Sequence, residues 1–395
     1  TITSKRLSMK QHRILFFVPD HIDAIGIHHE LITRLKECLS SEADVSMATS
    51  GAKKDVIQPS DYDIIHFFGC WSNSACSLAA RAYRHNTPYL LTPLGALQPW
   101  EMAQHRRSTL FNKQHQLTSK AAAVHVCGKL EQETFTHLGW NKRQEIIKNP
   151  ILTSQISFEE TARQLTNLYQ KILDSSARLL LSETARQMIG SLLQLGANKN
   201  TLLLHDHIAK LQQTFETLTD DDWRQIFIYA QEERITIPLT EGICRLQRDV
   251  PEVNTDEINR FEPDIEYPAG DLKADALLSK SLLLRNKVKD AFANRGSDER
   301  TLSLLILNLN YELSRHKAPL LHLVNLYQFI RFTNLDEDMA KDMVHELGLD
   351  DFAGRLMTVM ENFFGLTEGF MPFFPKNDKH AEHLLTELTK FGTYK

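Results

Sequence analysis

One stretch, from Asp61 to Trp100, constrains the fold of this chain more than any other. A continuous apolar run from Ile64 to Phe68 ends at Gly69, which is typical of a strand that is buried on both faces of a parallel sheet. Ser72 can cap a following amphipathic helix, and the next strand-like run, residues 88–92, stops at a proline. This order of strand, helix and strand predicts a right-handed βαβ unit.

The flanking sequence extends the same pattern into a larger domain. Arg13 to Pro19 reads as a strand, and a loop with Gly26 leads from it into an amphipathic helix. Further strands are expected at 45–48, 121–126 and 145–150. We therefore expect residues 11–155 to form a Rossmann-like domain built on a parallel sheet.

Beyond residue 155 the alternation of strands and helices stops. Residues 156–250 show the periodicity of consecutive helices, and residues 271–395 predict a second helical region, the C-terminal domain. Residues 251–270 contain three prolines and many acidic side chains, which favours a linker. The expected fold class is thus α/β plus α, a parallel-sheet domain followed by a mostly helical C-terminal region.

Composition narrows the class of protein. A formal net charge of −5 over 395 residues argues against a nucleic-acid-binding surface. The five cysteines are scattered and odd in number, which fits a reducing cytoplasm better than a disulfide framework. We find neither an apolar stretch long enough to cross a membrane nor the apolar core of a signal peptide. No His, Cys, Asp or Glu pattern has metal-ligand spacing, so no metal site is expected.

Ligands of an open parallel sheet bind at the carboxyl ends of its strands. In this sequence two of those ends fall at His66–Trp71, with His, Gly and Trp, and at Pro93–Trp100, with Gly and Trp. Trp71 and Trp100 can stack on the C–H face of a sugar ring, or can be ordinary core aromatics. His66 is the best candidate for a catalytic or acceptor-orienting residue, with a buried structural histidine as the alternative.

Two further segments are candidates for binding anionic groups. Gly26 opens a helix whose free N–H groups can hold an anion, or else it only permits a tight turn. It is a single glycine, so the dinucleotide-binding fingerprint is absent. Residues 101–120 form a basic helical stretch that can face phosphate or anionic lipid, or can be a solvated surface.

Three segments carry a family resemblance. They are I-G-I-H-H at 25–29, D-I-I-H-F-F-G-C-W-S at 63–72 and P-Y-L-L-T-P-L-G-A-L-Q-P-W at 88–100. In combination they resemble the N-terminal half of the GT-B glycosyltransferases, specifically the retaining family 4 group. With the strand-end positions, the resemblance gives one catalytic candidate in the first domain, His66, and six substrate-binding candidates: Gly26, His29, Gly69, Trp71, Gly95 and Trp100.

The resemblance implies that this domain holds an acceptor, either a carbohydrate or a lipid-linked glycan. In such enzymes a second Rossmann-like half binds the nucleotide-sugar donor, which here would be a UDP- or GDP-sugar. The chain departs from the family pattern at Phe68 and Leu94, where the family has histidine. Glu233 and Glu241 have the E-x7-E spacing of the donor-site pair, but the glycines of that motif and the strand before it are missing.

Two functions follow from the resemblance. The first is a hexosyltransferase of surface polysaccharide or glycoconjugate assembly, cytoplasmic or peripheral to the inner face of the membrane. Its donor site would be built from the helical half or supplied by a partner chain. The second is a non-catalytic descendant that binds a glycan, or that scaffolds and regulates other transferases. No cofactor is expected besides the donor.

Overall fold

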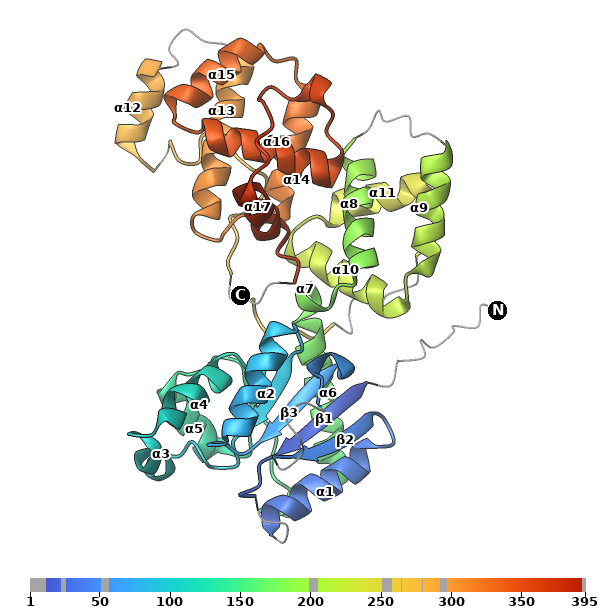
Figure 1. Cartoon of the computed structure of the whole chain (residues 1–395), viewed down its shortest axis with the longest axis vertical. Coiled ribbons are helices and arrows are strands. Elements are labelled where there is room, and N and C mark those ends of the chain that lie inside the picture. The colour runs from blue at the N-terminus through green and yellow to red at the C-terminus, as the bar shows by residue number, and fades with distance from the viewer. Residues whose placement is uncertain are drawn as a thin grey trace. The chain divides into compact units, whose positions relative to one another are not determined.

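The computed structural model describes residues 12–22, 26–50, 57–198, 205–250, 258–263, 265–278, 280–291 and 297–392. They divide into two compact units (Figure 1). Unit 1 contains the chain up to Leu180 and residues 258–262. Unit 2 contains the described residues between Leu181 and 250 and between Pro263 and 392.

Unit 1 is built on one six-stranded sheet with the strand order β2-β1-β3-β4-β5-β6. Figure 1 labels three of these strands, β1, β2 and β3. Every pair of neighbouring strands is parallel. This arrangement confirms the predicted Rossmann-like sheet. The strands are β1 (Arg13–Val18), β2 (Asp44–Thr49), β3 (Ile64–Phe68), β4 (Tyr89–Thr92), β5 (Ala123–Val126) and β6 (Gln144–Ile146).

Helices cover both faces of this sheet. The side chains of alternate strand residues point to opposite faces, so the strands β1 to β5 each contribute to two separate cores. One core contains α1 (Ile27–Leu39) and α6 (Phe158–Asp174). The other contains the three helices α2 (Asn73–Arg84), α4 (Thr109–Ser119) and α5 (Lys129–Leu138). The remaining elements are the short helices α3 (Pro99–His105) and α7 (Ala177–Leu180) and the 3-10 helix Pro59–Asp61.

Unit 1 extends beyond residue 155, where the sequence places the domain boundary. The reason is α6, which packs on α1 and buries one face against the sheet. The expected linker 251–270 also divides between the units in its described part. Phe261 belongs to unit 1, where its backbone N–H donates to the Ser175 hydroxyl, whereas Tyr267 belongs to unit 2.

The described residues of unit 2 form helices joined by loops and turns, with no strand among them, as the sequence predicts. Side chains cap several of its helices, and Thr219 and Asp222 form a complete capping box at α10. The helices are α8 (Glu183–Ala197), α9 (His205–Thr217), α10 (Asp220–Glu232), α11 (Thr236–Leu246), α12 (Leu282–Ala291), α13 (Ser297–Leu313), α14 (Leu320–Phe332), α15 (Glu337–Glu346), α16 (Asp350–Phe364), α17 (Lys379–Thr389) and the 3-10 helix Glu368–Phe370.

Two glycines let α8 and α11 approach each other with their backbones in contact. A Cβ atom on Gly196 would lie 1.8 Å from the carbonyl oxygen of Pro238. A Cβ atom on Gly242 would lie 2.0 Å from the carbonyl oxygen of Leu192. Backbone atoms cannot move aside as a flexible side chain can, so only glycine fits at either position.

We expect Gly196→Ala and Gly242→Ala each to lower the free energy of unfolding by more than about 3 kcal/mol, because the added methyl group must push two helices apart. Urea titration of each variant measures the change. Gly369→Ala is the matched control, since nothing lies within 4 Å of its Cβ position. Equal stability of the three variants would contradict the close helix crossing.

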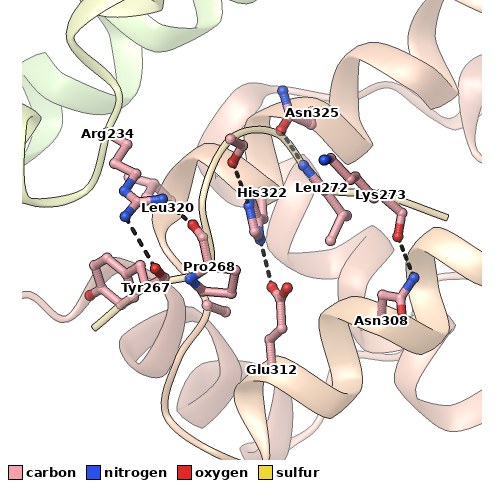
Figure 2. Close-up of polar contacts among 12 residues, drawn as sticks. Arg234, Tyr267, Pro268, Leu272, Lys273, Asn308, Glu312, Leu320, His322 and Asn325 are labelled. Carbon is pink, nitrogen blue, oxygen red and sulfur yellow. Dashed lines mark hydrogen bonds and ion pairs between the residues drawn. The ribbon is translucent and has the colours of Figure 1, made fainter. Parts of the chain in front are cut away.

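A strap formed by residues 265–278 crosses unit 2 and is held mainly through its backbone (Figure 2). The Arg234 guanidinium donates to the carbonyls of Tyr267 and Pro268, and the His322 ring donates from Nε2 to the carbonyl of Gly270 at 3.2 Å. His322 Nδ1 lies 2.5 Å from a carboxylate oxygen of Glu312. Side chains of unit 2 therefore satisfy backbone carbonyl groups of the strap that have no partner in a helix or sheet.

Asn308 of α13 makes the densest set of these contacts. Its amide nitrogen donates to the carbonyls of Lys273 and Ala274, and its oxygen accepts from the N–H of Leu277 at 3.2 Å. We expect Asn308→Ala to release this part of the strap at a cost of about 2–4 kcal/mol. Faster amide hydrogen exchange in 272–278 is the readout. Asn310→Ala on the same helix should leave that exchange unchanged.

Candidate functional site

Unit 1 has a topological switch point, where the direction of strand addition reverses. The chain adds β2 on one side of β1 and then returns to add β3 on the other side. Connections that diverge from such a switch point leave space between them at the carboxyl edge of the sheet. Here the two walls are the loop after β1 and the loop after β3.

Gly69 brings these walls together. It has a left-handed backbone with φ of 71°, and a Cβ atom there would lie 3.0 Å from Ile22 Cδ1 and 3.7 Å from His21 Nε2. The loop after β1 therefore lies directly over the end of β3. Gly69, one of the substrate-binding candidates, thus lies at the carboxyl edge of the sheet.

The loops after β3 and β4 have unusual backbone conformations. Trp71 and Leu94 have φ values of 62° and 55°, although neither is glycine, and Gly95 has a φ of 81°. A left-handed conformation costs a non-glycine residue about 1–2 kcal/mol. Strain of this kind is found where a structure holds residues in place for binding or catalysis.

Several contacts hold Trp71 in this conformation. Its backbone N–H donates to Oε1 of the buried Gln114 at 2.9 Å, and its indole N–H donates to the carbonyl of Ala96 at 2.8 Å. Its ring stacks on His105 of α3, with centroids 4.3 Å apart and planes 12° from parallel. Trp71 thus joins the loops after β3 and β4 to α3, and His105 already covers one face of its ring.

His21 lies in the loop after β1, close to Gly69, and was not predicted as a site residue. Desolvation is the main cause that lowers its pKa, Asp20 opposes the shift, and His105 adds to it. The lowered pKa favours a neutral imidazole that can accept a proton from a ligand. Its position directly after the first strand was the one available sequence signal.

The helices that begin at this edge carry their own negative charge. Glu30, Glu101 and Glu131 lie in the first turns of α1, α3 and α5. Glu131 accepts from the backbone N–H groups of Gly95 and Cys127, both at 2.7 Å. The amide of Gly95 is therefore already bonded, and carboxylates offset the positive ends of three helices.

Large apolar side chains are exposed at the same edge. Ile27, Trp100 and Leu130 are 48%, 61% and 69% exposed and lie in the first turns of α1, α3 and α5. Gly26 is exposed at the start of α1, with no side-chain cap, and His29 is half-buried in its first turn. The fold thus gathers the six substrate-binding candidates at one edge of the sheet. Contacts join Trp71 to the loop with Gly95 and to α3, which carries Trp100.

His66 is placed in the core instead. Its side chain is fully buried, with Nδ1 2.7 Å from the Tyr169 hydroxyl and Nε2 2.6 Å from the Thr92 hydroxyl. Phe68 stacks on its ring with centroids 4.0 Å apart. Both nitrogens are bonded and no face is exposed, so the catalytic role expected for His66 is replaced by a structural one.

His66 and His125 belong to one chain of buried hydrogen bonds. When both rings are neutral, the donor and the acceptor of each bond in this chain are fixed. His125 Nε2 lies 2.9 Å from the carbonyl of Ile147, which can only accept, so His125 Nδ1 must accept from Thr92 at 2.8 Å. Thr92 then accepts from His66 Nε2, and His66 Nδ1 accepts from the Tyr169 hydroxyl. Each tautomer is thereby fixed by its neighbour.

The two glutamates expected to hold a donor sugar are not brought together as a site. Glu233 is fully buried, and its carboxylate accepts from Lys390 Nζ at 2.9 Å, the N–H of Leu320 at 2.9 Å and the Tyr267 hydroxyl at 3.0 Å. Glu241 is exposed on α11. The prediction that these two residues form a donor site is therefore wrong. Glu233 forms a buried structural ion pair with Lys390, and Glu241 is a surface residue.

No family model, curated protein or solved structure matches this chain. Among the residues that the structure describes, no helix combines the length and apolar character needed to cross a membrane. The described residues also contain no group of three or more His, Cys, Asp or Glu side chains arranged to hold a metal ion.

The buried histidines make a prediction about acid stability. Burial lowers the pKa of His125 to about 4, and burial together with His125 holds the pKa of His66 well below its usual range. An unfolded histidine titrates near about 6.5, so the unfolded chain binds more protons below that pH. We expect the free energy of unfolding to fall by about 3 kcal/mol from His125 alone as the pH drops toward 4.

Urea titrations between pH 7 and pH 4 test this expectation. His125→Leu should be less stable than the parent at pH 7, because Thr92 and Ile147 lose a partner, yet its stability should depend less on pH. His85→Leu removes an exposed histidine and should keep the parent's pH dependence. The same pH dependence in His125→Leu and the parent would refute the assignment.

Proposed function

We propose that the carboxyl edge of unit 1 binds a carbohydrate, in the manner of the acceptor-binding half of a GT-B glycosyltransferase. The observation that carries the proposal is the strained loop of Trp71, which lies at the switch point of the sheet and is joined to α3. An exposed indole, Trp100, lies on that same helix.

The chemistry of the edge supports a neutral, hydroxyl-rich ligand. The apolar C–H face of a sugar can stack on an exposed indole such as that of Trp100. The neutral imidazole favoured at His21 can exchange hydrogen bonds with hydroxyl groups. Glu30, Glu101 and Glu131 already offset the helix N-termini, which disfavours a phosphate at this edge.

A non-catalytic glycan-binding or regulatory role is the form of the proposal that we favour. The described residues of unit 2 contain no second sheet, and the candidate donor glutamate Glu233 is fully bonded in the interior. A nucleotide-sugar donor needs cations or free N–H groups to neutralise its diphosphate.

One observation favours a catalytic alternative. The lowered pKa of His21, whose ring lies next to Gly69 at the carboxyl end of β3, suits a group that accepts a proton from an acceptor hydroxyl. In that case the chain is the acceptor half of a split hexosyltransferase, and a partner chain supplies the UDP- or GDP-sugar site. Such an assembly would bring the protein to lipid-linked glycans at the inner face of the membrane.

We expect the full chain to bind at least one glycan on an array of surface-polysaccharide fragments, and Trp100→Ala and His21→Ala each to weaken that binding roughly tenfold. The reason is that each change removes a group that faces the ligand. Phe374→Ala, which removes an aromatic side chain that is 84% exposed in unit 2, should leave the affinity unchanged.

Calorimetry with UDP and GDP tests whether the chain carries a donor site of its own. The absence of nucleotide binding by the folded chain is the result expected for both forms of the proposal, the non-catalytic role and a donor site on a partner. Binding of either nucleotide by the chain alone would instead indicate a complete transferase. If Trp100→Ala and Phe374→Ala reduce binding to the array equally, the glycan does not bind at the carboxyl edge of unit 1.

A further inference from the structure

Unit 2 contains a groove of about 550 Å³ that the carbohydrate proposal for unit 1 does not use. Its walls come from one face of α8, the carboxyl end of α16 and the last turns of α17 with Phe391. Ligand sites commonly have this size, with apolar surface and a few convergent polar groups. The groove lies entirely within the helical unit.

Two glycines shape the groove. A Cβ atom on Gly190 would lie 3.4 Å from Cε2 of Phe363, so the ring sits directly against the α8 backbone. A Cβ atom on Gly365 would lie 2.6 Å from Nε2 of Gln194. Gly365 ends α16 with a left-handed φ of 64°, and its lack of a side chain leaves room for the Gln194 amide.

Several polar groups that line the groove have no protein partner. The Nε atom of Arg186 is buried and makes no hydrogen bond. The side chains of Ser191, Gln194 and Asn362 also form none with the part of the chain that the structure describes. Ser191 and Gln194 are half-buried and Asn362 is exposed, so these three side chains can exchange hydrogen bonds with a ligand in the groove.

The charge around the groove disfavours an anion. Glu183 and Glu361 line it, and the negative end of the α16 dipole lies beside them. Among the described lining residues Arg186 is the only basic one, and its guanidinium lies 4.0 Å from Glu183. The apolar part of the surface comes from Phe363 and Phe391, whose ring centroids are 6.4 Å apart.

We propose that this groove binds a pyranose sugar that carries no negative charge. Amide, hydroxyl and guanidinium groups can bond the sugar hydroxyls, while the two phenyl rings face its C–H surface. The sugar can carry hydroxyl or amine substituents, because the carboxylates of Glu183 and Glu361 accept hydrogen bonds from either group. The proposal does not depend on the site proposed in unit 1.

Saturation-transfer NMR on the full chain tests the proposal with defined probes: glucose, galactose, mannose, glucosamine and glucuronate. We expect transfer to at least one neutral hexose or to glucosamine, and at least fivefold weaker transfer to glucuronate. Ser191→Phe fills the groove from a half-buried position on α8, and Gln194→Ala with Asn362→Ala removes two amides. Both variants should abolish the transfer while the melting temperature stays near that of the parent.

The outcomes separate this groove from the edge of unit 1. Loss of transfer in Ser191→Phe but not in Trp100→Ala supports the groove. Loss in Trp100→Ala alone assigns the sugar to unit 1 and overturns the inference while the proposed function stands. Absence of transfer from every probe, or glucuronate binding as well as the neutral sugars, also overturns it.

Discussion

A chain of buried hydrogen bonds is the interaction on which unit 1 depends. It runs from Tyr169 on α6 through His66, Thr92 and His125 to the carbonyl of Ile147, and so crosses three neighbouring strands on one face of the sheet. Neutral groups in a fixed order satisfy every donor and acceptor, which a buried polar network needs in order to stabilise a core. The same bonds fix α6 on the sheet. They therefore explain why unit 1 includes α6, which follows the last strand in the sequence.

The sequence predicted the sheet because local patterns determine it. Short apolar runs such as Ile64–Phe68, closed by Gly69 and followed by a capped helix, can form little else than buried parallel strands. The edge that gathers Gly69, Trp71 and Gly95 follows from the same topology. What local pattern could not give is the environment of His66, because its partner Tyr169 lies 103 residues further along the chain.

The same limit explains the donor-site glutamates and the missed histidine. Glu233 and Glu241 have the spacing of a known motif, but spacing says nothing about the Lys390 side chain, which reaches Glu233 from 157 residues away and forms a buried ion pair with it. His21 has no motif around it at all. It lies beside the end of β3 only because Gly69 lets the loop after β1 approach that strand.

The two proposed sugar sites share one physical property, which bears on whether the chain can transfer a sugar alone. At the edge of unit 1, Glu131 already occupies the N–H groups of Gly95 and Cys127. In the groove of unit 2, Glu183 and Glu361 outnumber the single guanidinium of Arg186. Both places suit hydroxyl groups and oppose phosphate, whereas departure of a nucleoside diphosphate needs a surplus of cations or free N–H groups. The proposed carbohydrate recognition is therefore consistent with the charges around Glu131 and in the groove.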